Sequence, residues 1–245
     1  MQPKPPVPYM KDGWLEDTRC SSIGPSALFQ RWNYQIRQSY GFLDPDVLEF
    51  TNSRWSVLLI TRPSKAVTSR GVVGTPVAPK TLSTTSHSDS IITSVSSRII
   101  ANQAEVELAL NEYTATHQMS FRAVDINTLS FEQQVSVLNQ ASIVIGMHGT
   151  AIASTIHMAI GTNYCCGVIE ILPQKEFGRI HAFGNMVRRL GGYHRRLTIP
   201  ESATDAATGS TVDPESLISA LDAMRRDIDH RSSCMLPSVL RNPYL

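Results

Sequence analysis

Residues 141–160, ASIVIGMHGTAIASTIHMAI, decide the fold of this chain. Their β-branched run at 143–145 predicts a buried parallel strand. The turn Gly146-Met-His-Gly149 comes next, and its two glycines allow the backbone to bend sharply and to approach a ligand closely. Small residues at helical spacing then predict a helix over 150–160. The stretch therefore predicts a strand, a tight turn and a helix.

The turn that ends at Gly149 is predicted to bind an anion. Free backbone N–H groups in the first turn of a helix, together with the helix dipole, favour negative charge there. Gly149 and Thr150 would supply such N–H groups and Thr150 its hydroxyl, although Thr150 is also an ordinary N-cap residue. His148 would add a hydrogen bond or a positive charge; the alternative is a histidine that only caps the local backbone. A phosphate group is the ligand that this turn favours.

Glu170 is the acidic residue of a second apolar strand, predicted over 167–172. Burying a carboxylate without a partner is costly, so Glu170 needs one. Ribose hydroxyls are one candidate, because ligands of parallel α/β sheets bind beyond the carboxyl ends of the strands. Arg179 or His181 is the other candidate. Phosphate and ribose together indicate a nucleotide.

Strands and helices alternate along the rest of the chain. The predicted strands are 55–61, 121–126, 142–147, 167–172 and 194–199. The predicted helices are 26–40, 102–115, 130–139, 150–160, 179–191 and 214–230. This alternation predicts a doubly wound, parallel α/β sheet. Residues 201–211 are predicted to form a polar loop.

Side chains near the helix starts and along the first helix support these boundaries. The expected capping residues are Asn102 with Glu105, Ser130 with Gln133, and Asp213 before Pro214. In the helix at 26–40, apolar residues at roughly helical spacing predict a face packed on the core. These residues are Leu28, Phe29, Trp32 and Ile36.

Several motifs together resemble a known family. They are Val57-Leu-Leu-Ile-Thr-Arg62, Arg98-Ile-Ile-Ala-Asn102 with Glu105, Ser130-Phe-Glu-Gln-Gln134, and the His148-Gly149 turn followed by the strand with Glu170. Over roughly residues 55–200, their order resembles the C-terminal, nucleotide-sugar half of glycosyltransferase family 61. That family includes β-1,2-xylosyltransferases and O-linked N-acetylglucosaminyltransferases of the secretory pathway. Thr150-Ala151 departs from the Ala-Gly that the family usually has after His-Gly.

The resemblance implies a Rossmann-like donor half of a GT-B glycosyltransferase. Its expected reaction is inverting transfer of N-acetylglucosamine or xylose from a UDP donor to a hydroxyl of a glycoprotein or glycan. His148 would be catalytic, donating to the β-phosphate as the nucleotide leaves. The expected substrate-binding residues are Arg62, Arg98, Asn102, Gly149, Thr150 and Glu170. The alternatives are a truncated or inactive domain that binds nucleotide sugars without turnover, and a domain for an unrelated phosphorylated ligand.

The expected domain organisation follows from this resemblance. Residues 1–54 are a Pro-rich tail and a cover helix, the remnant of an acceptor domain, and 233–245 are a C-terminal tail. Residues 55–232 are the Rossmann-like domain. Within it, 15 of the 34 residues at 64–97 are Ser or Thr, which predicts a surface loop, either merely solvated or closing over a diphosphate. The catalytic base is not assigned.

Composition and motifs exclude several functions. The net charge of +1 gives no field for nucleic acid or an anionic membrane, and no phosphate-loop, dinucleotide or nucleophile-elbow motif is present. Transfer is expected to need no metal and no cofactor besides the UDP-sugar substrate. Cys20, Cys165, Cys166 and Cys234 lack the spacing of zinc ligands; they are free thiols or, if the resemblance holds, one of the adjacent pair bonds Cys20 or Cys234.

The chain as given has no signal peptide and no apolar run long enough to span a membrane. The resemblance implies the lumen of the Golgi or of the endoplasmic reticulum. Since family members carry an anchor or a leader, a truncated gene model is the expected explanation of this difference. No contact of this segment with a membrane is expected.

Overall fold

The computed structural model describes residues 26–41, 55–62, 98–160, 166–174, 182–205 and 208–230. The N-terminal tail, the Ser/Thr-rich loop at 64–97, Arg179, His181 and all the cysteines except Cys166 lie outside these ranges. The helices are α3 (Ala27–Ser39), α5 (Gln103–Thr116), α6 (Phe131–Asn139), α7 (Thr150–Ala153), α8 (Ala182–Leu190) and α9 (Pro214–His230). The strands of the main sheet are β1 (Ser56–Thr61), β2 (Ser120–Asp125), β3 (Ile143–Met147), β4 (Gly167–Pro173) and β5 (Tyr193–Ile199).

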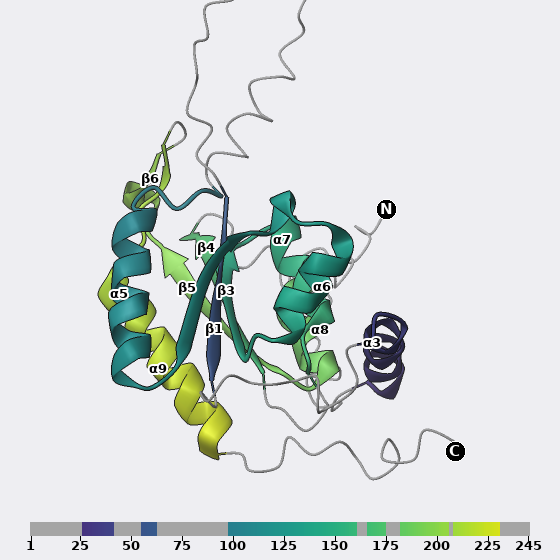
Figure 1. Cartoon of the computed structure of the whole chain (residues 1–245). Coiled ribbons are helices and arrows are strands. Elements are labelled where there is room, and N and C mark those ends of the chain that lie inside the picture. The colour runs from purple at the N-terminus through teal and green to yellow at the C-terminus, as the bar shows by residue number, and fades with distance from the viewer. Residues whose placement is uncertain are drawn as a thin grey trace, which may run out of the picture.

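The five strands form one parallel sheet in the order β2-β1-β3-β4-β5 (Figure 1). The predicted doubly wound, parallel α/β fold is therefore confirmed. Strand order reverses between β1 and β3, because the chain adds β2 on one side of β1 and β3 to β5 on the other. Such a reversal opens a crevice at the carboxyl ends of the two strands, which is where ligands of this architecture bind.

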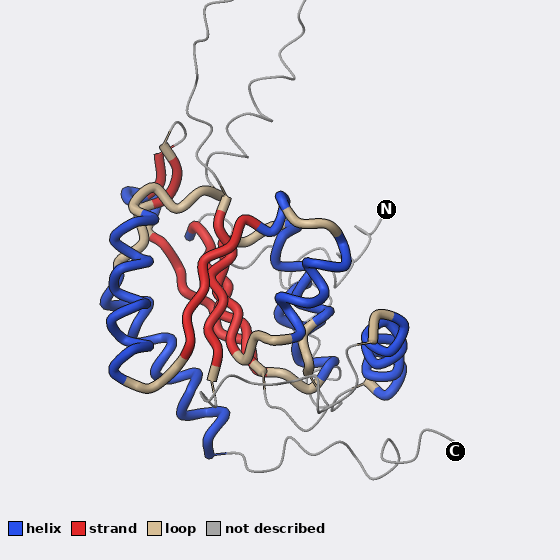
Figure 2. Tube along the Cα trace, in the orientation of Figure 1, coloured by secondary structure: helices blue, strands red, loops and turns tan. Residues whose placement is uncertain are grey.

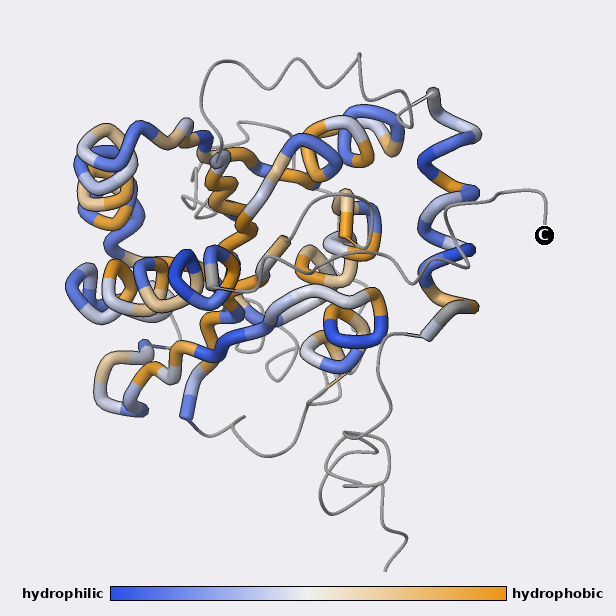
Figure 3. The backbone as a smooth tube through the Cα atoms, turned by 90° about the horizontal axis from the view of Figure 1, so that it is seen from below, coloured by the Kyte–Doolittle hydropathy of each residue, from blue (hydrophilic) through white to orange (hydrophobic). Residues whose placement is uncertain are grey.

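Helices cover both faces of the sheet (Figure 2). Helices α5 and α9 lie on one face, and α6, α7 and α8, with α3 outside them, lie on the other (Figure 1). The β-branched and aliphatic side chains of the central strands alternate between two hydrophobic clusters, one under each helical layer. In Figure 3 the hydrophobic colour accordingly follows the strands between the helices. Strands that are buried on both faces explain the nearly continuous apolar runs in the sequence.

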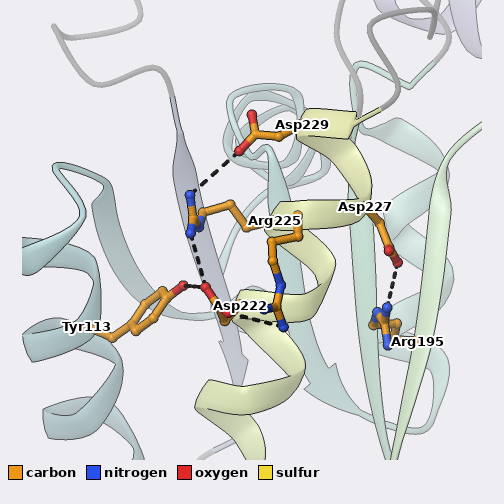
Figure 4. Close-up of polar contacts among 7 residues, drawn as sticks. Tyr113, Arg195, Asp222, Arg225, Asp227 and Asp229 are labelled. Atoms are coloured by element: carbon orange, nitrogen blue, oxygen red, sulfur yellow. Dashed lines mark hydrogen bonds and ion pairs between the residues drawn. The ribbon is translucent and has the colours of Figure 1, made fainter.

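Polar and charged side chains link α9 to α5 and β5 and also pair along α9 itself (Figure 4). The Tyr113 hydroxyl of α5 donates to Asp222 of α9 at 2.9 Å. Arg225 bridges Asp222 and Asp229 along α9, and Arg195 of β5 pairs with Asp227 at 2.6 Å. These pairs are partly exposed, so each contributes little to stability, and the apolar side of α9 does most of the packing.

Helix α3 covers the domain, as predicted, but its buried face is polar rather than apolar. Leu28 is 75% exposed and Trp32 is 44% exposed. The buried residues are Gln30, Asn33 and Arg37. Of the predicted apolar face, Phe29 packs against a core cluster, whereas Leu28 and Trp32 do not. The polar side chains are buried more deeply because they find partners at the ends of three other segments. Gln30 donates to the Leu190 carbonyl, Asn33 to the Ile156 and Met158 carbonyls, and Arg37 to the Asn139 side chain.

Most predicted boundaries lie within two residues of the observed ones, with two exceptions in the described part. The helix predicted at 150–160 has only four α-helical residues and continues as a 3₁₀ turn, η2 (Ser154–His157). The polar loop predicted at 201–211 contains a 3₁₀ turn, η4 (Glu201–Ala203), and a short antiparallel pair, β6 (Thr204–Asp205) and β7 (Gly209–Ser210). A further 3₁₀ turn, η1 (Ile126–Thr128), follows β2.

The predicted caps have mixed outcomes. Ser130 and Gln133 form the reciprocal capping box at the start of α6, and Asp213 accepts from the Ser216 amide at the start of α9. Asn102 occupies the N-cap position of α5 without a side-chain cap bond. Its side-chain amide donates instead to the carbonyl of Val212, which lies 110 residues away and which no local pattern indicates as a partner. No helix in the described ranges combines the length and the apolar character needed to cross a bilayer.

Candidate functional site

The candidate site lies at the carboxyl ends of β1 and β3, where strand order reverses. Arg62 follows the last residue of β1, and His148 and Gly149 follow the last residue of β3. Ile60 pairs with Gly146 in the β1–β3 register, so the two strand ends are level with each other. The fold therefore brings together two predicted parts of the site, Arg62 and the His148-Gly149 turn, that lie 86 or more positions apart in the sequence.

Gly149 has the backbone conformation that only glycine adopts easily, with φ +142° and ψ −174°. A Cβ at this position would lie 3.0 Å from Nη2 of Arg62 and 3.3 and 3.4 Å from Cδ and Nη1 of Arg98. Two guanidinium side chains thus lie directly against the Gly149 backbone. Gly146, by contrast, is part of β3 rather than of the turn, and a Cβ there would meet Ile152 of α7 at 2.9 Å.

The two guanidinium groups share a confined, positively charged space. Burial lowers the pKa of Arg62, the neighbouring Arg98 lowers it further, and Asp125 partly opposes them. Nε of Arg98 is buried and has no hydrogen-bond partner among the described residues. Two like charges beside the same backbone and an unpaired donor are both stabilised by an anion. Guanidinium groups bind phosphate oxygens with paired hydrogen bonds.

The helix that begins at Thr150 adds less to this site than its predicted length implied. A helix of four residues followed by a 3₁₀ turn has only a small dipole. The positive charge of the site therefore comes mainly from Arg62 and Arg98. The backbone of Thr150 begins α7, as predicted, whereas the Thr150 side chain is not among the groups that the structure describes.

Asn102 makes a different set of contacts from those expected of a substrate ligand. Its side chain accepts from the Val212 amide at 2.9 Å and donates to the Val212 carbonyl at 2.8 Å and to Glu105 at 2.9 Å. These bonds tie the start of α5 to the segment before α9. A role for Asn102 in substrate binding stays a prediction, and its geometry favours a structural role.

A second polar group lies beside the turn, on β4 and β5. The carboxylate of Glu170 accepts from Nδ1 of His148 through one oxygen and from Nε2 of His194 through the other, at 2.9 Å for His194. Nε of Arg196 is 3.8 Å from the same carboxylate. Only 1% of the Glu170 side chain is exposed. The expectation that Glu170 needs a partner is confirmed, but its partners are these two imidazoles; the ribose contact stays a prediction.

The protonation states of this group follow from burial and hydrogen bonding. Burial by itself raises the pKa of Glu170, but the hydrogen bonds and charges of His148 and His194 outweigh it and lower that pKa to about 2. Burial also lowers the pKa of His194, against the opposing influence of Glu170. At neutral pH the group therefore contains an ionised carboxylate and a neutral His194.

His194 is a residue of this group that the sequence analysis missed. It begins the polar run His194-Arg-Arg196 in a strand whose neighbour, β4, carries a single buried acid. A polar run beside a buried carboxylate is a usable signal, but only once the two strands are known to be adjacent. Register pairs Glu170 with Arg196, which places their side chains on the same face of the sheet.

One sequence pattern bears on the prediction that transfer needs no metal. The chain contains two Asp-x-Asp triplets, a pattern often used to bind a metal-diphosphate, at 44–46 and 227–229. The first lies outside the described residues. In the second, Asp227 pairs with Arg195 and Asp229 with Arg225 on α9. Among the described residues, no group of three or more potential metal ligands is arranged around a common point.

The parallel sheet with helices on both faces defines a Rossmann-like α/β domain, a fold consistent with a glycosyltransferase domain. The family model described as Glycosyltransferase 61 matches residues 58–165, a range that holds Arg62, Arg98, Asn102 and the His148-Gly149-Thr150 turn. The match supports membership of glycosyltransferase family 61 and a glycosyltransferase activity, as the motifs predicted. A search of curated proteins finds no match.

Proposed function

We propose that the chain binds a UDP-sugar at the reversal between β1 and β3 and transfers the sugar, N-acetylglucosamine or xylose, with inversion to a hydroxyl of a glycoprotein or glycan. The observation that carries this proposal is the pair of guanidinium groups, from Arg62 and Arg98, against the Gly149 backbone. A diphosphate is the ligand that best matches two convergent guanidinium groups beside a histidine.

Charge development supports the same assignment. As the bond between the sugar and the β-phosphate breaks, negative charge accumulates on the leaving nucleotide. Arg62 and Arg98 offset this charge without a metal, and His148 adds a hydrogen bond from the end of β3. The domain corresponds to the donor half of a GT-B enzyme, which acts in the lumen of the Golgi or of the endoplasmic reticulum.

Calorimetric titration of the purified chain with UDP, UDP-N-acetylglucosamine and UDP-xylose, without metal, tests the proposal. Arg62→Gln and Arg98→Gln should each weaken UDP binding by roughly 10- to 100-fold, since a hydrogen bond to a charged group contributes about 1.5–3 kcal/mol. Arg122→Gln, on the exposed surface of β2, is the matched control and should bind like the unmodified chain.

The outcomes of this titration are distinct. A folded chain that does not bind UDP, or Arg98→Gln and Arg122→Gln variants with equal affinity, would refute the site. Binding that prefers one UDP-sugar identifies the donor. Release of UDP in the presence of an acceptor glycan then establishes transfer, whereas binding without release identifies the alternative of a nucleotide-sugar-binding domain without turnover.

A further inference from the structure

We propose that Glu170 is a positioning residue: it fixes which ring nitrogen of His148 meets the donor diphosphate, and His194 holds the same carboxylate from its other side. The inference rests on the proposed function of the site for its ligand. It assigns a role to Glu170 other than ribose binding, and it adds His194, on β5, to the residues on which transfer depends.

The geometry leaves the His148 side chain little freedom. Its backbone amide donates to the Ile171 carbonyl at 2.7 Å, which holds the residue against β4. Its ring lies beside Phe183 of α8, with the ring centroids 5.2 Å apart. Nδ1 is bonded to Glu170. The remaining nitrogen, Nε2, is therefore the one available to a ligand.

This orientation matters because the two nitrogens of an imidazole have different roles. An ionised carboxylate only accepts, so Nδ1 must carry the proton of the His148–Glu170 bond. Phosphate oxygens also only accept, so a hydrogen bond from His148 to the diphosphate requires a second proton, on Nε2. Glu170 holds the ring in the orientation that turns Nε2 to a ligand, as a buried carboxylate does for the histidine of a catalytic triad.

His194 holds the Glu170 carboxylate in place, and α8 leaves space for the His194 ring. Nε2 of His194 donates to the second oxygen of Glu170, and the His194 side chain is 1% exposed. A Cβ at Gly184 of α8 would lie 2.7 Å from Nδ1 of His194. Gly184 therefore admits the ring to the position from which it reaches Glu170. In the described part of the chain, the other charged groups that act on this cluster are Arg188 and Arg196.

The tautomer of His148 tests the proposal in the unmodified, ligand-free chain. Nitrogen-15 NMR distinguishes a protonated from a bare ring nitrogen, and a His148→Gln variant identifies the signals of His148 among those of the seven histidines. The expected result is a proton on Nδ1 that is retained when UDP is added. A free chain that carries its only proton on Nε2 would overturn the proposal.

Variants test the effect on binding. Glu170→Gln keeps the size of the side chain but removes its charge, and should weaken UDP binding about tenfold; Glu170→Asp should recover part of that loss. Glu112→Gln, an exposed carboxylate on α5, is the control. A folded Glu170→Gln chain with unchanged affinity would contradict the proposal.

Gly184→Ala tests the contribution of His194 without altering either polar partner. It should displace the His194 ring, shift its NMR signals, and give a UDP affinity between those of the unmodified chain and Glu170→Gln. Moved His194 signals with unchanged affinity would remove His194 from the proposal. Failure of the unmodified chain to bind UDP would refute the proposed function, while the His148 tautomer would still decide the role of Glu170.

Discussion

Replacing Gly149 by alanine should destabilise the protein and disturb the arginine pair. At φ +142° and ψ −174° the backbone of Gly149 is in a region that is essentially restricted to glycine, where another residue costs about 1–3 kcal/mol. The new Cβ would also lie 3.0 Å from Arg62 Nη2 and 3.3 Å from Arg98 Cδ, so both side chains must move by a few tenths of an ångström. We expect a total loss of about 2–4 kcal/mol in the free energy of unfolding.

Gly41 supplies the matched control for this prediction. It also has a positive φ, +75°, but a Cβ there meets no atom within 4 Å. Gly41→Ala should therefore show backbone strain alone, about 1 kcal/mol. Urea denaturation of the three proteins measures the difference, and an Arg62→Ala background should relieve part of the Gly149→Ala effect, because the crowded guanidinium is then absent.

Two results would refute this reasoning. Equal losses of stability for Gly149→Ala and Gly41→Ala would mean that the arginines do not crowd Gly149. Strictly additive effects of Gly149→Ala and Arg62→Ala would show that the two residues do not interact. Gly149→Ala, which displaces the guanidinium groups, should also lose more UDP affinity than Gly41→Ala, which does not. Calorimetry can measure this difference.

Two further predictions concern stability. Burial lowers the pKa of His157 and of His194 below 6.5, so the folded chain disfavours their protonation. The free energy of unfolding should therefore fall as the pH drops below 6.5. It should fall again from pH 4.5 towards pH 2, because Glu170, whose pKa is lowered in the folded chain, is then protonated. Urea denaturation at pH 8 and 5.5 measures this slope, His157→Leu should flatten it, and a pH-independent midpoint would contradict the assignment. Asn33→Ala should lower the free energy of unfolding by about 1–3 kcal/mol, because it leaves buried carbonyls without their donor. Gln35→Ala, at an exposed position of the same helix, is the control and should change it by less than about 0.5 kcal/mol. Equal effects of the two variants would contradict the capping role of Asn33.

The sheet was predictable from local sequence because its strands are buried on both faces. Runs such as 143–145 and 168–172 are rich in β-branched residues, too short for a buried helix, and closely bounded by turns. The turn at Gly149 was predictable for a similar reason: glycine and histidine between a strand and a helix allow few other conformations. Each of these inferences needs only neighbours in sequence.

The partners of individual polar side chains were not predictable in this way. Asn102 has the local pattern of a helix cap, yet a backbone segment 110 residues away binds it. Glu170 was expected to bind a ribose or to pair with Arg179 or His181, but β5 lies beside β4 and brings His194 to it. Asn33 of α3 caps the turn at 156–158, on another segment of the same helical layer. Such contacts depend on which segments are adjacent, and a single sequence does not specify that.

The buried, polar face of α3 determines how this helix can detach from the domain. Gln30, Asn33 and Arg37 attach it through hydrogen bonds, while Leu28 and Trp32 already face solvent. Detachment would thus exchange protein hydrogen bonds for bonds to water, and the apolar side chains of α3 that it would newly expose are chiefly the half-buried Phe29 and Ile36. Such an opening contributes little to the heat capacity or denaturant dependence of unfolding. Amide hydrogen exchange would detect it as a separate event, with α3 exchanging earlier than the strands that it covers.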